Sequence, residues 1–271
     1  MPADYSVLMS VYIKEKPENL RRSIESMLAQ SVPPSDFVLV CDGILSDVLY
    51  SVISDFSGRY SFINVIQLET SGGLGNALNH GLGFCKNDIV ARMDSDDIAM
   101  PDRMKRQLKA LAVHEADIVS AAVEEFKDTP GDTGVFRVLP ETHNEIIEFS
   151  RRRNPFNHPC TVFRKQRVYM AGGYIETKWF EDYYLWLRML DSGCIGYNLP
   201  EPVLYMRSGR EMYKRRGGLK YVSAALKFRK KMFNEGFCGL FDFLYACTAH
   251  IISGIIPGRL RMILYSRLLR K

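Results

Sequence analysis

The sequence predicts an α/β fold in which a mostly parallel sheet is covered by helices on both faces. Between residues 5 and 94, short apolar runs alternate with amphipathic segments of helical length. The apolar runs are continuous, whereas a strand with one face in water alternates apolar and polar residues. Both faces of these strands should therefore be buried. Ligands of such sheets gather beyond the carboxyl ends of the strands.

The first half of the chain supplies four strands and three helices in strict alternation. The predicted strands are residues 5–12, 36–43, 63–69 and 88–94, and the predicted helices are residues 17–31, 46–60 and 73–85. Pro17 stands in the first turn of its helix, Ser46 is a plausible N-cap, and glycines open the third helix.

The regular alternation weakens after residue 126. A helix at 101–116 and a strand at 117–126 continue the pattern. Residues 127–145 are rich in Pro, Gly, Asp and Thr and should form a loop or short hairpin. Residues 154–165 read as a turn and a strand, and residues 180–193 as a helix.

The C-terminal part differs in charge from the rest. The net charge is +5, yet residues 203–271 hold 15 Lys and Arg against 3 Asp and Glu. Within it, residues 237–256 are strongly apolar but interrupted by Asp242 and His250. We expect residues 219–271 to form basic amphipathic helices that lie on an anionic membrane, with a spanning helix or ordinary core helices as alternatives.

The cysteines and the N-terminus point to a reducing compartment. The six cysteines form no C-x-x-C pair, and the N-terminus has no uninterrupted apolar segment of a signal peptide. The expected location is the cytoplasm, with the cysteines as small buried hydrophobic residues.

Three carboxylates, Asp94, Asp96 and Asp97, crowd directly behind the strand predicted at 88–94. Like charges so close repel one another unless a cation lies among them. Carboxylate oxygens suit Mg²⁺ or Mn²⁺, and such ions assist reactions in which a diphosphate leaves. An isolated Asp-x-Asp is also common in solvated turns, but its place at the end of a buried strand favours the metal.

Several segments, taken in order, resemble a known family. These are SVLMSVY, VCDG, GLGNALNHG, ARMDSDDIAMPDRMKRQL and FEDYYLWLRML. Over residues 5–205 they resemble family 2 glycosyltransferases with a GT-A fold. NPFNHPCTVFRK, AGGY and MYKRRGGLKY resemble bacterial enzymes that build O-antigen or exopolysaccharide repeat units on a polyprenyl carrier. The resemblance implies a catalytic domain at 1–205, with a nucleotide-binding half (1–100) and an acceptor-binding half (101–205), then a mobile basic loop at 206–218.

The resemblance implies a site for a UDP-sugar. Asp96 would bind the metal directly, Asp94 would contact the metal or the ribose, and Asp42 would bind the uracil edge unless it only caps a turn. Asn79 would line the donor pocket or serve as a buried helix amide, and Asp97 would cap a turn. The remaining implied donor contacts are Ser10, Val11, Tyr12, Asn76 and Ser95, together with Arg207, Arg215 and Arg216 of the basic loop.

Asp182 is the implied catalytic base of an inverting transfer, since one carboxylate must take the proton of the acceptor hydroxyl. Two acids in the first turn of a helix also favour its dipole, so Glu181 would have that role or contact the acceptor. Trp179 is an implied sugar-stacking platform, with core packing as the alternative. His158 would contact the acceptor or serve as a structural turn residue.

The predicted function is metal-dependent transfer of one hexose, glucose or galactose in β linkage, from a UDP-sugar to a polyprenyl-diphosphate-linked N-acetylhexosamine. The protein would lie peripherally at the cytoplasmic face of the inner membrane. A UDP-N-acetylhexosamine transferase is the alternative within this class. A nucleotidyltransferase would need a glycine-rich phosphate loop after the first strand, and a membrane-binding module without activity would leave the acids unexplained. No nucleic acid is expected, because the C-terminal part lacks spaced base-stacking aromatic residues.

Overall fold

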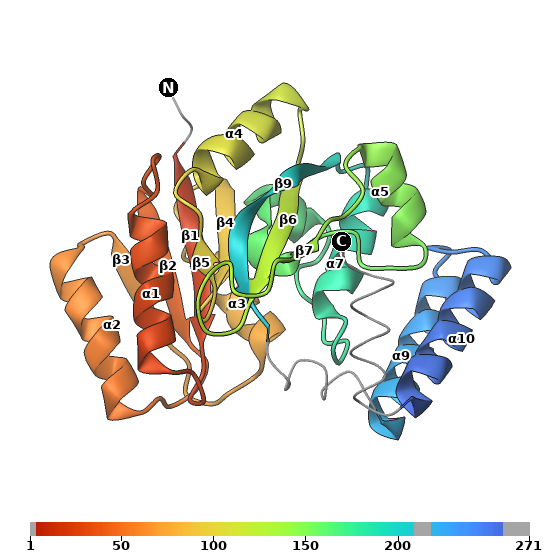
Figure 1. Ribbon diagram of the computed structural model, residues 1–271, viewed down its shortest axis with the longest axis horizontal. Helices are drawn as coiled ribbons and strands as arrows, with labels where there is room; N and C mark the ends of the chain where they lie inside the picture. Colours follow the sequence, from red (N-terminus) through yellow and green to blue (C-terminus); the bar gives the residue numbers. More distant parts are fainter. Residues whose placement is uncertain (1–3, 209–217, 257–271) are drawn as a thin grey trace.

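The computed structural model describes residues 4–208 and 218–256 (Figure 1). The strands are β1 (Tyr5–Val11), β2 (Asp36–Cys41), β3 (Ile63–Gln67), β4 (Ile89–Asp94), β5 (Ile98–Ala99), β6 (Ile118–Phe126), β7 (Val135–Arg137), β8 (Val162–Arg164) and β9 (Gly196–Arg207). The helices are α1 (Pro17–Leu28), α2 (Asp47–Arg59), α3 (Leu74–Leu82), α4 (Arg103–Val113), α5 (His143–Ser150), α6 (Lys165–Met170), α7 (Glu181–Asp191), α9 (Leu219–Asn234), α10 (Leu240–Ile255) and the 3₁₀ turn η1 (His158–Cys160).

One sheet of order β3-β2-β1-β4-β8-β6-β9-β5 forms the centre of the fold. The pairs β3-β2, β2-β1 and β1-β4 are parallel, which confirms the α/β class and the alternation in the first half. Beyond β4 the sheet becomes mixed, because β8 pairs antiparallel with both β4 and β6. β8 follows a turn that reverses the chain, whereas the parallel strands are joined by helical crossovers.

Helices cover the sheet on both faces, as the continuous apolar strands predict. Alternate side chains of β1 point to opposite faces. Val7 and Met9 pack with α1, α2 and α4, whereas Leu8 packs with α3, α6 and α7. Ser46 caps α2 by accepting the backbone N–H of Leu49, as predicted.

The second half contains short elements that periodicity did not indicate. β7 pairs with β6, which confirms the hairpin expected in residues 127–145. α5 begins with a capping box of Thr142 and Glu145, a sequence signal that we overlooked. β5, α6 and β9 were also missed. β9 runs to Arg207, so residues 206 and 207 belong to the sheet and not to a loop.

Helix α7 packs against two hydrophobic clusters, one on each of two opposite sides. Trp186 and Met189 face the sheet, whereas Tyr183 and Phe180, which directly precedes the helix, contact α9. Phe180 stacks on Phe228 of α9 with 4.6 Å between the ring centroids. One face of α9 therefore belongs to the core, and association of the C-terminal part with a membrane stays a prediction. In the described part of the chain, no helix is long and apolar enough to cross a membrane.

Gly81 allows α3 to approach the sheet. A Cβ atom at this position would lie 2.5 Å from Val40 Cγ2 and 2.6 Å from Leu8 Cδ1. At Gly58 of α2, nothing lies within 4 Å of the same position.

We expect Gly81→Ala to lower the free energy of unfolding by about 1–3 kcal/mol, because the added methyl group overpacks the interface of α3 with the sheet. Gly58→Ala is the matched control and should raise it by about 0.5–1 kcal/mol, since alanine favours helix. Urea denaturation measures both. Equal effects of the two changes would contradict the close approach.

Candidate active site

The acid cluster predicted from the sequence lies at the carboxyl end of β4. One oxygen from each of Asp94, Asp96 and Asp97 lies within 4.8 Å of the others. Ser95 Oγ donates a hydrogen bond of 2.7 Å to Oε2 of Glu15, which brings a fourth acid to the cluster. Asp97 is buried and accepts the backbone N–H of Arg207 at 2.7 Å, so it joins the cluster to the end of β9.

The acids of the cluster are only partly neutralised by the nearby Arg92 and Arg207. Burial, followed by the charges of Asp94 and Glu15, raises the pKa of Asp96 to about 7. Burial and the neighbouring acids also raise the pKa of Asp97 well above its usual range. A divalent cation would relieve this repulsion, and hard carboxylate oxygens are the donors that Mg²⁺ and Mn²⁺ prefer. The residues present therefore fit such an ion, with Asp94 and Asp96 as the groups that would hold it.

Arg92 lies behind the cluster and was missed by the sequence analysis. Its side chain is only 1% exposed and contacts Oδ1 of Asp94 through Nη2. Among the described residues, its Nε and Nη1 atoms have no hydrogen-bond partner. The spacing of two residues places Arg92 and Asp94 on the same face of β4, which is the signal that could have identified it.

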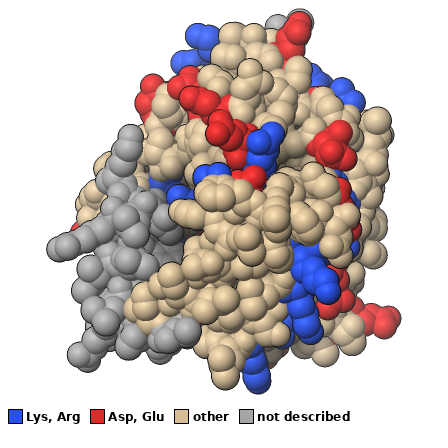
Figure 2. Space-filling view, turned by 90° about the vertical axis from the view of Figure 1, so that its right-hand side faces the viewer, with Lys and Arg blue, Asp and Glu red and all other residues tan. Residues whose placement is uncertain are grey.

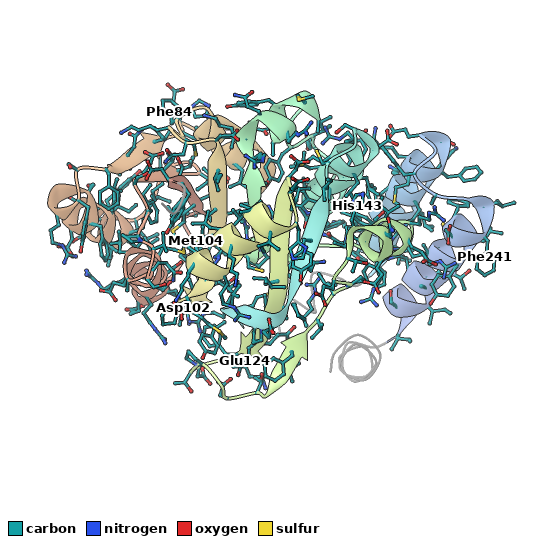
Figure 3. All side chains as sticks on the ribbon, turned by 90° about the horizontal axis from the view of Figure 1, so that it is seen from above. Phe84, Asp102, Met104, Glu124, His143 and Phe241 are labelled. Atoms are coloured by element: carbon teal, nitrogen blue, oxygen red, sulfur yellow. The ribbon has the colours of Figure 1, made fainter. Side chains whose placement is uncertain are left out.

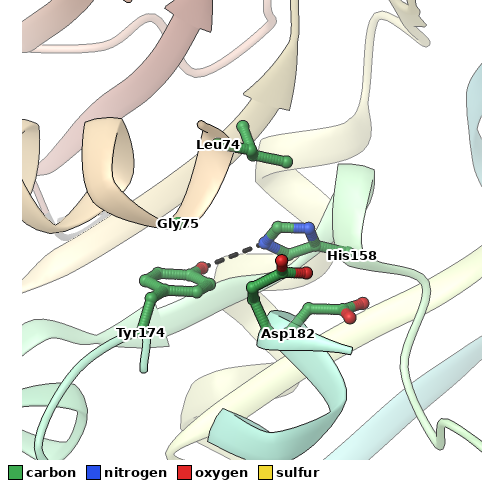
Figure 4. Close-up of a pocket in the computed structure, with 6 residues that line it drawn as sticks. Leu74, Gly75, His158, Tyr174 and Asp182 are labelled. Carbon is green, nitrogen blue, oxygen red and sulfur yellow. Dashed lines mark hydrogen bonds between the residues drawn. The ribbon is translucent and has the colours of Figure 1, made fainter. Parts of the chain in front are cut away.

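Asp182 stands in the first turn of α7, at a small cavity (Figure 4). The cavity is lined by Leu74, Gly75, His158, Tyr174, Glu181 and Asp182. Oδ2 of Asp182 accepts a hydrogen bond of 2.7 Å from Nδ2 of Asn154. Oδ1 of Asn154 in turn accepts the backbone N–H of Phe156, which fixes the orientation of the amide. Asn154 was also not identified from the sequence.

Burial dominates the pKa of Asp182 and raises it above the usual range. The backbone N–H of Tyr183, the Asn154 amide and the charge of Arg92 act in the opposite direction. These groups favour the ionised form, which is the form that accepts a proton.

His158 and Tyr174 form another wall of the cavity and face each other across a 3.0 Å hydrogen bond between Nε2 and the hydroxyl group (Figure 4). Burial, followed by the charge of Arg92, holds the pKa of His158 well below its usual range, so the imidazole is neutral. Asn79 exchanges two hydrogen bonds with the backbone of Tyr174, at 2.6 and 2.7 Å. These bonds favour the buried-amide alternative for Asn79.

The residues predicted to contact the nucleobase meet at the ends of β1 and β2. Parallel pairing places Ser10 beside Asp94. The side chain of Val11 is buried in the core, which leaves only its backbone for a ligand, whereas Tyr12 is 45% exposed. Asp42 accepts hydrogen bonds from Ser71 Oγ and the backbone N–H of Gly72, at 2.9 and 2.8 Å.

The two hydrogen bonds of Asp42 stabilise the loop that precedes α3. This agrees with the alternative in which Asp42 caps a turn. The side chain of Asn76 also lies against this loop, since a Cβ at Gly72 would meet its amide nitrogen at 2.3 Å.

Arg207 is not placed as predicted. Its guanidinium donates to the carbonyl oxygens of Asp96 and Lys127, at 3.1 and 2.7 Å, and lies over the ring of Phe126. It supports the backbone beside the acid cluster, because β9 pairs with β6 up to this residue. The placement of Arg207 in a loop is therefore wrong, since it ends β9. Its contact with a diphosphate stays a prediction. Arg215 and Arg216, the other predicted loop contacts, lie outside the described residues.

Trp179 and Glu181 flank Asp182. Trp179 has a positive φ of 70° and packs against Tyr221 of α9, with 5.6 Å between the ring centroids. Glu181 accepts the backbone N–H of Trp179 at 3.2 Å and lines the cavity. Glu181 therefore stabilises the start of α7, while its burial raises its pKa.

Residues 6–173 match the family model described as Glycosyl transferase family 2. The chain belongs to this family. The nucleotidyltransferase and non-enzymatic alternatives are thereby excluded, and the chain is a glycosyltransferase.

Curated relatives match nearly the whole chain. UDP-Gal:alpha-D-GlcNAc-diphosphoundecaprenol beta-1,3-galactosyltransferase of Escherichia coli is 36% identical over 268 residues, which is 98% of this chain and 97% of the relative. Amylovoran biosynthesis glycosyltransferase AmsE of Erwinia amylovora is 41% identical over 230 residues, covering 84% of this chain and 85% of the relative.

Solved glycosyltransferases of GT-A type share the fold. Staphylococcus aureus TarS (residues 1–349) with UDP-GlcNAc superposes with a TM-score of 0.66 at 18% identity, covering 86% of this chain and 67% of TarS. Mannosyltransferase PcManGT from Pyrobaculum calidifontis, with GDP-Man and Mn²⁺, also gives a TM-score of 0.66 at 15% identity, covering 97% of this chain and 79% of PcManGT.

Asp96→Ala should abolish the Mn²⁺-dependent part of UDP binding, because it removes a central oxygen donor of the cluster. Calorimetry of UDP binding with and without Mn²⁺ measures this. Asp128→Ala changes an exposed acid on the β6–β7 turn and serves as the control. An unchanged Mn²⁺ dependence in Asp96→Ala would refute the metal assignment.

Asn154→Ala should lower kcat by about tenfold to a hundredfold, because Asp182 loses the group that orients it. It should also move the acidic limb of the kcat/KM profile to higher pH, since the amide favours the ionised carboxylate. Asn234→Ala, at the exposed end of α9, is the control. A lower rate with an unmoved acidic limb would show that Asn154 does not act through Asp182.

Proposed function

We propose that the protein is an inverting, metal-dependent transferase that moves one hexose from a UDP-sugar to a sugar on a polyprenyl diphosphate. The observation that carries this proposal is the position of Asp182. Its carboxylate lies at a cavity wall, oriented by Asn154, while Arg92 provides a positive charge between it and the acid cluster. The site thus has separate places for a leaving diphosphate and for a proton acceptor.

The reaction needs only one base. An acceptor hydroxyl loses its proton to Asp182 as its oxygen attacks the anomeric carbon, and the bond from that carbon to the UDP oxygen breaks on the opposite face. When bound, a divalent ion neutralises charge on the departing diphosphate. Asp94 and Asp96 would hold that ion, and the neutral His158 with Tyr174 would offer hydrogen-bonding groups to the acceptor.

Similarity over nearly the full length supports the substrate class. The Escherichia coli relative is named for galactose transfer from UDP-Gal to a GlcNAc-diphosphoundecaprenol, in β-1,3 linkage. We infer galactose or glucose as the donor sugar and a carrier-linked N-acetylhexosamine as the acceptor. The product is β-linked if an α-linked UDP-hexose is inverted.

The deciding experiment incubates the protein and Mn²⁺ with a synthetic polyprenyl-diphosphate GlcNAc and, in turn, UDP-Gal, UDP-Glc, UDP-GlcNAc and UDP-GalNAc. Extension by a single β-linked hexose, established by mass spectrometry and NMR, is expected. Preferential use of an N-acetylated donor would establish the N-acetylhexosaminyltransferase instead. An α-linked product would refute inversion.

Asp182→Asn should reduce kcat by at least about a thousandfold and leave UDP affinity within about twofold, because the amide cannot accept the proton. For the unaltered protein, kcat/KM should fall with decreasing pH through a midpoint above the usual Asp value. The sign follows from the raised pKa, since the base is lost when it protonates. A near-normal rate in Asp182→Asn would remove Asp182 as the base.

A further inference from the structure

Helix α10 presents an apolar face to solvent. Its large exposed side chains are Leu240, Phe241, Leu244, Tyr245, Ile251 and Ile252. Their spacing places them on one side of the helix, as the 3.6-residue period requires. Phe241 is 71% exposed and lies at the outer edge of the molecule (Figure 3). Surface helices in water normally bury their apolar face and expose their polar face.

The inner face of α10 packs against helix α9. Ala246 and Ser253 are buried, and α10 packs along α9. His250 lies between the helices, where its ring meets those of Phe180 and Tyr221. The packing of α10 against α9 therefore does not require that the outer face of α10 be apolar.

Basic side chains border this face (Figure 2). Arg152 forms an ion pair of 2.5 Å with Asp242, and its guanidinium lies 5.3 and 5.2 Å from the ring centroids of Phe241 and Tyr245. Asp242, the acid of α10, is thus neutralised. On the neighbouring α9, Lys220, Lys227 and Lys230 are exposed. An apolar strip with a cationic border matches the acyl boundary and phosphates of a bilayer.

The length of α10 determines how it would lie. Its 16 residues span about 24 Å, which is less than the hydrocarbon thickness of about 30 Å. A position parallel to the surface buries the apolar strip and keeps the lysines at the headgroups.

We propose that α10 and its border form a membrane-docking surface, in which the outer face of α10 inserts into an anionic lipid surface and α9 contributes lysines to the phosphates. This surface is distinct from the catalytic cavity. The sequence predicts that residues 219–271 associate with a membrane, and we assign this binding to the insertion of α10. Arg229, one of the basic residues of α9, is only 3% exposed and bonds to Tyr183 and to the Arg152 carbonyl oxygen, so it is not available to lipid.

Sedimentation of the full-length protein with phosphatidylcholine vesicles, with and without 25% phosphatidylglycerol, tests the proposal. Phe241→Ser combined with Leu244→Ser should lower the partition coefficient by at least about tenfold on both compositions, because two inserted side chains are lost. Changing Lys220, Lys227 and Lys230 together to Gln should remove only the excess binding to the anionic vesicles.

Val113→Ser combined with Met170→Ser is the matched control, since these apolar residues are 64% and 69% exposed on other helices. It should bind as the unaltered protein does. Circular dichroism and UDP affinity establish that each variant is folded, and they keep this test separate from that of the proposed activity.

Two results would overturn the proposal. In one, the α10 variant binds vesicles like the unaltered protein. In the other, the protein is a dimer in solution that the α10 change dissociates while vesicle binding is unchanged, in which case the surface joins two copies of the chain.

Discussion

The repulsion among carboxylates at the end of β4 is the constraint on which the site depends. Asp94, Asp96 and Asp97 lie within one cluster, and Glu15 adds a fourth charge through Ser95. Such crowding is tolerated only because fixed groups oppose it: Arg92 contacts Asp94, and the backbone N–H of Arg207 binds Asp97. The pKa of Asp96 is raised first by burial and then by the charges of Asp94 and Glu15, and the charges of Arg207 and Arg92 offset this only in part. A bound divalent cation would supply the positive charge that these acids lack.

Arg92 links this constraint to the proposed base. Its charge lowers the pKa of Asp182 and of His158, although burial acts on the two in opposite senses. For Asp182 the charge favours the ionised carboxylate, and for His158 it favours the neutral ring. One buried cation therefore helps to set the protonation state on both walls of the cavity. Among residues 4–208 and 218–256, its Nε and Nη1 atoms find no hydrogen-bond partner, and burying such groups unpaired costs stability.

The sequence predicted those elements whose signal is local. β1 to β4 and α1 to α3 follow from continuous apolar runs and helical spacing, and the acid cluster and Asp182 follow from motifs. Asn154 could not be found in this way, because its role depends on a contact with Asp182, 28 residues away and in a different element. Arg92 could have been found from its spacing of two residues from Asp94 in β4, but its burial behind the cluster depends on the packed sheet. β5, with two residues, exists only through its pairing with β9. Arg207 was assigned to a loop by the family resemblance, whereas its backbone pairs with β6, a strand about 80 residues earlier in the chain.

The sequence gives the number of cations in the C-terminal part, but it does not show which of them are exposed and which are buried or paired. Arg229 lies in the core between Tyr183 and the Arg152 carbonyl oxygen, and Lys231 pairs with Glu235. Lys231 Nζ also lies 4.6 Å from the ring centroid of Tyr184 in α7, so both cations contribute to the contact of α9 with the rest of the fold. Since α9 packs on α7, and α7 carries Asp182 in its first turn, the basic segment also helps to hold the helix of the proposed base in place. A change that removes its charges indiscriminately would therefore disturb the site and the membrane-docking surface together, whereas the outer side chains of α10 can be altered without touching either core of α7.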